Sequence, residues 1–504
     1  MRPRSEFEAG GKPGLFKEGS HMELRHLPWG KIALGLGMAG LVAAHPALAQ
    51  EAVTAAATAA DAAATVAAEA AAPVAAAAAP VAEAAPAVPV PDKGDTAWMM
   101  VSTVLVMLMI VPGLALFYGG LVRTKNMASV LTQILGVASL AMVMWVIFGY
   151  GLSFGGDANQ FVSTGKFFLA GVNADSTVAT FSDGVVIPEF VFIAFQMTFS
   201  AITVALVVGG LVERMKFSAL MVFAIVWLTI VYYPIAHMVW YLGGDDAATG
   251  LIFGWGALDF AGGTVVHINA GISALVGALI LGKRIGYQKE LIAPHSLTMT
   301  LIGTGLLWVG WFGFNAGSAL EANGSAGLAL INTFTATAAG VLFWMLTEKL
   351  LGHSGSLLGA CSGAIAGLVA ITPAAGNSGP FGGILLGAIG ATAACIFVMK
   401  VKPKLGFDDS LDVFGIHGVA GIIGSIGTAF TMLTVLGGPA GDDYALWPQV
   451  WIQVKSVAVA IVWSAVGAAI AFYIAKALTG LRVSEEVERE GLDLGEHGER
   501  AYNY

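Results

Sequence analysis

The chain of 504 residues is 57% hydrophobic and only 11% charged, whereas about a quarter of the residues in an ordinary soluble domain are charged. This composition excludes a soluble globular protein and predicts an all-α polytopic membrane protein. The net charge of −9 says little about partners, because charge in such a chain lies in loops and tails. We expect no nucleic-acid partner. The two cysteines lie in apolar runs without metal-ligand spacing, so we expect core thiols, with a disulfide as the disfavoured alternative, and neither a metal site nor a cofactor.

The chain begins with segments that lie outside the predicted membrane domain. Residues 1–21 end close to Gly-Ser-His-Met, which resembles a cloning scar, so we treat them as a tag-like segment. Residues 22–49 combine basic residues, an apolar stretch and a final Ala-x-Ala, which predicts a cleaved signal peptide. The alternative, an uncleaved first transmembrane helix, is disfavoured by Pro46. Residues 50–92 are rich in alanine and proline, and predict a flexible periplasmic tether.

Residues 93–478 form the predicted membrane domain. They contain apolar runs that each reach the roughly 20 residues a helix needs to cross a bilayer. Eleven spans are therefore predicted, near residues 97–121, 127–154, 190–212, 218–242, 260–282, 296–319, 326–347, 355–374, 379–399, 411–434 and 450–475.

The charges between the spans predict their orientation. Lysines and arginines occupy every second connection, while the other connections are acidic and have Lys166 as their only clear base. Because basic loops remain in the cytoplasm, this pattern places the N-terminus in the periplasm and the C-terminus in the cytoplasm. The expected location is the bacterial inner (plasma) membrane, surrounded by lipid.

A six-residue pattern, His-x-x-Ala-Gly-Ile, occurs at His267 and again at His417. These positions fall in the fifth and tenth spans, which divides the chain into two groups of five helices with one helix left over. Because each group has an odd number of spans, the second group must have the opposite orientation, which is the arrangement of an inverted repeat with its site near the midplane. We expect the two histidines to meet there.

Ionisable side chains inside a membrane indicate function, although a hydrogen-bonded structural role remains the alternative. Side by side in a low dielectric, His267 and His417 cannot both be cationic, so a neutral pair would offer one N–H group and one lone pair to a pore. A metal site lacks further ligands at suitable spacing. Asp259 and Asp412 are expected at helix starts, where their carboxylates would accept backbone N–H groups or hold a neighbouring loop.

Aromatic residues cluster near the ends and middles of several spans. Interfacial belts would also place tryptophan and tyrosine there, so the pattern does not separate a belt from a pore. A ring face beside a hydroxyl group would nevertheless suit a small cation.

Seven blocks of the sequence, in matching order, resemble the bacterial ammonium transporters of the Amt/Mep/Rh family. The resemblance extends from about Asp92 to the end of the chain, and the tether is its only departure. The blocks are Pro112 to Gly120, Pro234 to Trp240, Asp259 to His267, Gly310 to Ser318, Gly359 to Gly367, Asp412 to Gly418 and Glu490 to Asp493.

The resemblance implies a homotrimer with one pore in each subunit, and eleven helices in a five-plus-five inverted repeat plus a long last helix. It also assigns roles to residues of this chain. It implies recruitment of ammonium by Trp240, Ser318 and Phe199, and a gate of stacked Phe199 and Phe314. It also implies that His267 and His417 line the pore below the gate. Asp259 matches an aspartate that supports the recruitment site, and every one of these positions carries the family's residue.

The implied activity is transport of ammonium or ammonia, not enzymatic catalysis. Ammonium would lose a proton beyond the gate and pass as ammonia, with the proton either following the histidines or staying outside. Two alternatives are an ammonium sensor that signals through its tail, and a conduit for another small neutral solute. The absence of a signalling domain after residue 504 disfavours the sensor, and the aromatic mouth disfavours a neutral solute.

The last segment, residues 479–504, is polar and rich in glutamate. Its charge alone would predict a disordered terminus. The resemblance instead implies an ordered cytoplasmic regulatory tail that packs under the trimer and couples to a PII-type signalling protein.

Overall fold

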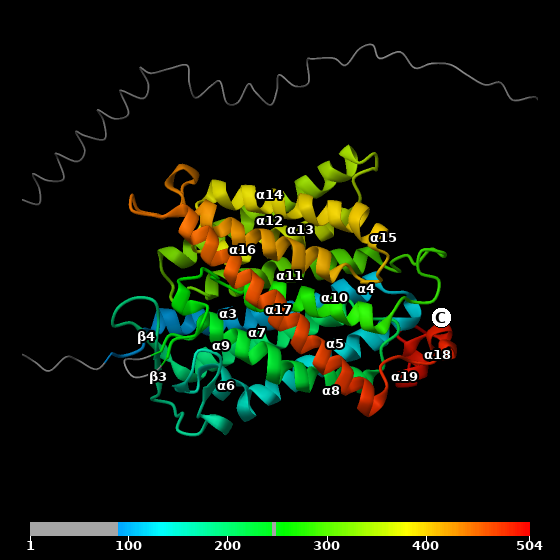
Figure 1. The fold of residues 1–504 in the computed structure, drawn as a ribbon, viewed down its shortest axis with the longest axis horizontal. Helices are drawn as coiled ribbons and strands as arrows, with labels where there is room; N and C mark the ends of the chain where they lie inside the picture. The colour runs from blue at the N-terminus through cyan, green and yellow to red at the C-terminus, as the bar shows by residue number, and fades with distance from the viewer. Residues whose placement is uncertain (1–88, 244–247, 504) are drawn as a thin grey trace, which may run out of the picture. The chain divides into compact units, whose positions relative to one another are not determined.

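The computed structural model describes residues 89–243 and 248–503. The tag-like segment, the signal peptide and nearly all of the predicted tether lie outside these residues. Within them, eleven helices are long and apolar enough to cross a membrane, and they match the predicted runs (Figure 1). The predicted number and approximate positions of the spans are therefore confirmed.

The spans are made of α-helices, several of which continue into one another through π-helical turns. The α-helices are α3 (Lys93–Leu108), α4 (Ala115–Leu121), α5 (Met127–Met144), α6 (Tyr150–Phe154), α7 (Glu189–Val208), α8 (Phe217–Trp227), α9 (Tyr233–Trp240), α10 (Asn269–Leu281), α11 (Leu297–Gly317), α12 (Gly324–Leu350), α13 (Leu357–Ile371), α14 (Pro380–Ile396), α15 (Lys402–Leu405), α16 (Ala420–Thr431), α17 (Leu446–Thr479), α18 (Glu485–Glu490) and α19 (Leu492–His497). The π-helical turns are η2 (Met109–Leu114), η4 (Trp145–Gly149), η6 (Leu228–Tyr232), η8 (Gly263–Ile268), η10 (Phe397–Val401) and η11 (Phe414–Val419).

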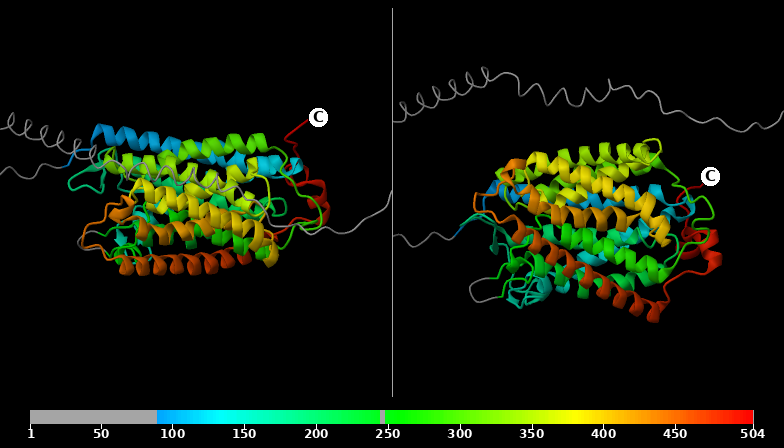
Figure 2. Two further views of the ribbon diagram at one scale, coloured as in Figure 1. Left: turned by 90° about the horizontal axis from the view of Figure 1, so that it is seen from above. Right: turned by 45° about the horizontal axis from the view of Figure 1, so that its top comes forward.

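The connections add short 3-10 helices and two small hairpins. The 3-10 helices are η3 (Thr124–Asn126), η5 (Phe167–Leu169), η7 (Phe253–Trp255), η9 (Thr372–Ala374) and η12 (Thr434–Leu436). Strand β1 (Asp157–Ala158) pairs antiparallel with β2 (Ser163–Thr164), and β3 (Thr177–Ala179) with β4 (Val186–Pro188). The β3–β4 hairpin lies at one end of the bundle, and α18 and α19 lie at the other (Figures 1 and 2). We call these the hairpin end and the tail end.

Small residues allow the helices to pack closely. A Cβ atom on Gly340 of α12 would lie only 2.3 Å from the carbonyl oxygen of Gly363 on α13. In a membrane, such contacts between small residues replace the hydrophobic driving force that packs helices in water. The final span, α17, has 34 residues, which corresponds to roughly 50 Å of helix. It is therefore the long last helix that the resemblance implied.

The tail is folded against the bundle. The Asp493 carboxylate accepts hydrogen bonds from the backbone N–H groups of Ala128 (3.1 Å) and Ser129 (2.8 Å), at the start of α5. Glu496 accepts the N–H of Phe217 at the start of α8, at 2.9 Å. Both carboxylates thus satisfy free N–H groups of helix N-termini, where negative charge is favourable. The prediction of a disordered tail, which rested on charge alone, is therefore wrong.

A buried ionic network holds the tail-end connections together. Glu213 is 1% exposed and pairs with Arg123 at 3.0 Å and with Arg284 at 2.9 Å. Arg284 also contacts Asp408 at 2.9 Å. Burial on its own would raise the pKa of Glu213, but attraction by Arg284 and Arg123 prevails and lowers the pKa from 4.5 to about 2. Folding is therefore linked to ionisation of this carboxyl group.

We predict that Glu213→Gln lowers the free energy of unfolding at pH 7 by about 3 kcal/mol, the value of a pKa shift of this size. Because the folded pKa lies below the unfolded one, this contribution is complete above about pH 4.5 and is lost as the pH falls toward 2. Thermal unfolding midpoints in detergent between pH 2 and 7 should therefore depend less on pH in the variant. The variant should keep part of the pH dependence of its unfolding midpoint, because Asp408 still pairs with Arg284. Glu485→Gln, at an exposed position, is the control, and equal midpoints for the two variants at pH 7 would contradict the prediction.

Candidate functional site

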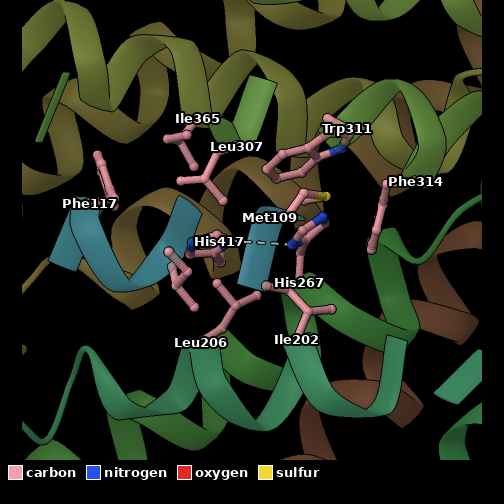
Figure 3. A pocket seen from close by; sticks show the side chains of 11 residues that line it. Met109, Phe117, Ile202, Leu206, His267, Leu307, Trp311, Phe314, Ile365 and His417 are labelled. Carbon is pink, nitrogen blue, oxygen red and sulfur yellow. Dashed lines mark hydrogen bonds between the residues drawn. The ribbon is translucent and has the colours of Figure 1, made fainter. Parts of the chain in front are cut away.

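The two predicted histidines meet inside the bundle. His267 lies in η8 and His417 in η11, and the two rings are 1% and 3% exposed. Their Nδ1 atoms are 3.2 Å apart and their ring centroids 5.3 Å apart. Figure 3 shows this pair, with apolar side chains on both sides of it. The prediction that the repeated pattern brings two imidazoles together is confirmed.

The glycines of the repeated pattern explain how the rings come so close. A Cβ on Gly271 would lie 2.4 Å from the backbone nitrogen of Gly418, beside His417. A Cβ on Gly421 would lie 3.3 Å from the Cβ of His267. Each half therefore supplies the glycine that makes room for the histidine segment of the other half. This reciprocity requires the same spacing between histidine and glycine in both halves.

The histidines line a narrow, almost entirely apolar cavity. Its volume is about 10 Å³, which is roughly the room that one water-sized molecule needs. The Nε2 atom of His267 has no hydrogen-bond partner within the described protein. An unpaired ring nitrogen on such a cavity can serve as a donor or an acceptor for a passing molecule. The cavity is lined by Met109, Leu114, Phe117, Ile202, Leu206, His267, Leu307, Trp311, Phe314, Ile365 and His417.

Two phenyl rings close one end of this cavity. Phe199 on α7 and Phe314 on α11 are stacked, with centroids 4.2 Å apart and planes 11° apart. Phe314 lies next to His267, at 5.9 Å between centroids (Figure 3). Both phenylalanines are at most 1% exposed. The rings predicted as a gate are therefore in contact, between the cavity and a wider vestibule.

The vestibule lies on the other side of the rings, at the hairpin end, and has a volume of about 330 Å³. Trp240 packs edge-on against Phe199 at 5.7 Å, and its indole N–H donates to the Asp259 carbonyl oxygen. The Ser318 hydroxyl donates to the Phe314 carbonyl oxygen at 2.8 Å. Since its proton is engaged there, the Ser318 oxygen presents lone pairs that can accept an N–H group. Trp240, Phe199 and Ser318 all line the vestibule.

Asp259 caps the helix that carries His267. Its two carboxylate oxygens accept the N–H groups of Gly262, Gly263, Thr264 and Val265, at 2.6 to 3.1 Å. Burial raises the pKa of Asp259 to about 6, and these four donors oppose a larger rise. The side chain thus fixes the start of η8, while the backbone carbonyl of the same residue orients Trp240. The predicted helix-start role of Asp259 is confirmed.

The corresponding cap in the second half comes from a different residue. Asp409, fully buried, accepts the Phe414 N–H at the start of η11 at 2.7 Å. Asp412 instead pairs with Lys402, which fulfils the second predicted role, that of holding a neighbouring loop. Asp412 has a positive φ of 60°, so the chain turns there before the helix begins. The sequence analysis missed Asp409, although two adjacent aspartates before the span were a signal.

Trp311 is a further residue whose role the sequence analysis did not assign. Its ring stacks on His267 at 5.3 Å and 21°, and its N–H donates to the Thr372 hydroxyl at 2.9 Å. This contact fixes the plane of the His267 ring. The residue belonged to a quoted block, but neither belt nor core patterns distinguish a tryptophan that orients a histidine.

A membrane-length helix bundle with a vestibule, a pair of closing rings and a narrow apolar pore is the architecture of a channel-like transporter of small solutes. The chain belongs to the Ammonium Transporter Family, whose model matches residues 97–502. It is similar to an ammonium transporter of Aquifex aeolicus, with 47% identity over 82% of this chain and 94% of the relative. It is also similar to one of Bacillus subtilis, with 43% identity over 81% and 98% of the two chains.

Solved structures share the fold. The chain superimposes on Saccharomyces cerevisiae Mep2 with a TM-score of 0.69 and 34% identity, over 79% of this chain and 88% of that one. It superimposes on a protein described as a sensor Amt protein with a TM-score of 0.72 and 26% identity, over 80% and 98% of the two chains.

We predict that Asp259→Ala lowers thermal stability, because it removes the acceptor of four N–H groups at the start of η8. A lost helix cap costs about 1–2 kcal/mol. The measurement is the unfolding midpoint in detergent, with Asp442→Ala at an exposed position as the matched control. If both variants unfold at the wild-type temperature, the cap does not stabilise the site.

Proposed function

We propose that the protein transports ammonium or ammonia through the pore just described, without catalysing a chemical reaction. Membership of the family and the names of the relatives support the substrate. The observation that carries the proposal is a continuous series of rings from the vestibule to the centre. Adjacent centroids are 5.7 Å apart from Trp240 to Phe199, 4.2 Å to Phe314, 5.9 Å to His267 and 5.3 Å to His417.

Ammonium is first held in the vestibule by Trp240, Phe199 and Ser318. The ring faces attract a small cation through their quadrupoles, by roughly 0.5–2 kcal/mol each. The lone pairs of Ser318 accept an N–H group, which ammonium has and a bare alkali cation lacks. Asp259 supports this site by holding Trp240 in place.

The substrate then loses its proton at the phenyl pair. A fixed charge in a dry cavity lined mainly by hydrocarbon is strongly unfavourable, so ammonia is the species that passes Phe199 and Phe314. His267 and His417 can meet it as a neutral pair, since a contact between two Nδ1 atoms requires one donor and one acceptor. The ring that donates then has a bare Nε2, and the other ring carries its proton there. The proton of ammonium either follows the histidines or stays in the vestibule.

The same proposal gives the molecule a place in the cell. The hairpin end faces the periplasm and the tail end faces the cytoplasm of a bacterial inner membrane, as the basic connections indicate. The protein works as a homotrimer with one pore in each subunit, and its tail is the regulatory contact for a PII-type signalling protein.

We predict that purified protein in liposomes responds to an ammonium jump and not to a potassium jump. Solid-supported-membrane current and an internal pH dye are recorded together. A current means that charge moves with the substrate, and a dye response without current means neutral conduction. Silence in both measurements would contradict transport.

The variants His267→Asp and His417→Glu place carboxylates in the pore, so potassium should then pass. Continued exclusion of potassium would show that the histidines do not select the substrate.

The tail yields a second prediction. Deleting residues 480–504 removes the acidic caps at the starts of α5 and α8, so we expect a several-fold change in transport and loss of PII binding. Asp493→Ala removes only the cap on α5 and should have a smaller effect of the same sign. Transport current and PII co-elution are the measurements. Unchanged values for the deletion would show that the tail does not regulate the pore.

A sensor is the second candidate, because one structural neighbour is described as a sensor Amt protein. In that case ammonium would bind the vestibule with little flux, and the tail would report it. Ammonium-dependent protection of the wild-type protein against unfolding, together with silence in both transport measurements, would favour the sensor.

A further inference from the structure

One positively charged side chain lines the vestibule, where it would hinder the entry of a cationic substrate. Lys166 is the only charged side chain among the residues that line the described vestibule. The remaining lining residues are aromatic, aliphatic or neutral polar, and they include Tyr150, Phe199, Trp240 and Ser318. An uncompensated lysine would repel ammonium from this mouth. Its presence therefore needs an explanation.

Lys166 is engaged by a buried carboxylate. Its Nζ atom lies 2.6 Å from Oε1 of Glu189, the first residue of α7. The same oxygen accepts the Tyr150 hydroxyl at 2.6 Å. The Glu189 side chain is 4% exposed, whereas that of Lys166 is 35% exposed. The carboxylate is thus fixed in the protein, and the lysine covers it from the vestibule.

The lysine head group resembles the substrate chemically. It is an ammonium group with three N–H donors on a flexible stem. The position beside Glu189 is therefore one that free ammonium, or another monovalent cation, would occupy if the lysine were absent. A buried carboxylate without a partner is strongly unfavourable, so it would attract such a cation.

We propose that Lys166 and Glu189 together determine the cation specificity of the vestibule. In this proposal the Lys166 ammonium group stays paired with the Glu189 carboxylate, so that this carboxylate presents no unpaired negative charge to the vestibule. Cations are then selected by the acceptor Ser318 and the ring faces, rather than collected by charge alone. This inference rests on the proposed function and adds a specificity-determining pair to it.

The two single variants should act in opposite directions. Lys166→Met uncovers the carboxylate, so the half-saturating ammonium concentration should fall about threefold or more, and potassium should become a competitive inhibitor. Glu189→Gln leaves the lysine uncompensated, so the half-saturating concentration should rise about threefold or more, less so at high ionic strength. The double variant has no net charge change and should return to within about twofold of the wild type.

The experiment is ammonium-driven transport in proteoliposomes, with and without potassium. Lys166→Arg retains the positive charge beside Glu189, so potassium should remain without effect on ammonium transport by this variant. Tyr150→Phe removes the other partner of Glu189 without changing any charge, and should shift half-saturation by less than about twofold. If Glu189→Gln does not fold, the two lysine variants still test the proposal, because potassium should inhibit Lys166→Met and should not inhibit Lys166→Arg.

A purely structural ion pair would behave differently. Both single variants would then lower the unfolding midpoint and weaken transport in the same direction, and potassium would remain without effect. That result would overturn the inference while leaving the proposed function intact. A wild-type protein that is silent toward ammonium would instead remove the proposed function, and the inference with it.

Discussion

The contact between the two histidine-bearing segments determines the geometry of the centre of the molecule. Backbone approaches at Gly271 and Gly421 bring η8 and η11 close enough for the His267 and His417 rings to touch. Any side chain at Gly271 would meet backbone at 2.4 Å, so the segments would have to separate. The repeated spacing of histidine and glycine is thus a packing requirement as well as a chemical one, because each half makes room for the other.

Among the described residues, the ion pairs lie toward the two ends of the bundle and not at the histidine pair. At the tail end, Glu213 lies between two arginines, and at the hairpin end Glu189 holds a lysine. Buried pairs of this kind add little stability over apolar packing, but removing one partner is costly. They hold the connections in one arrangement. Between them, the described pore offers a substrate mainly hydrocarbon, with two imidazoles at its centre.

The spans were predictable because hydropathy and length report directly on a bilayer. The histidine pair was predictable because the repeat signals two equivalent positions. The vestibule residues and the stacked phenyl pair could be predicted only from the resemblance to a known family, because aromatic residues at span ends have the same pattern in interfacial belts and in pores. The adjacent aspartates before the span were a signal for a cap, but the sequence did not show that Asp409 rather than Asp412 provides it, because this depends on a turn with positive φ at Asp412. The orientation of His267 by Trp311 depends on tertiary contact and leaves no periodic signal.

Under the proposed function, the vestibule has to separate ammonium from potassium. The two ions have the same charge and similar size, so a fixed carboxylate at the mouth would attract both by the same Coulomb term. Selection has to come from what only ammonium carries, its N–H donors and its removable proton. In the proposed function, a vestibule that holds Lys166 against the Glu189 carboxylate and presents neutral acceptors such as the Ser318 hydroxyl would offer that distinction before the phenyl pair. The apolar cavity would repeat this distinction under the proposed mechanism, because ammonium could enter it as a neutral molecule and potassium could not.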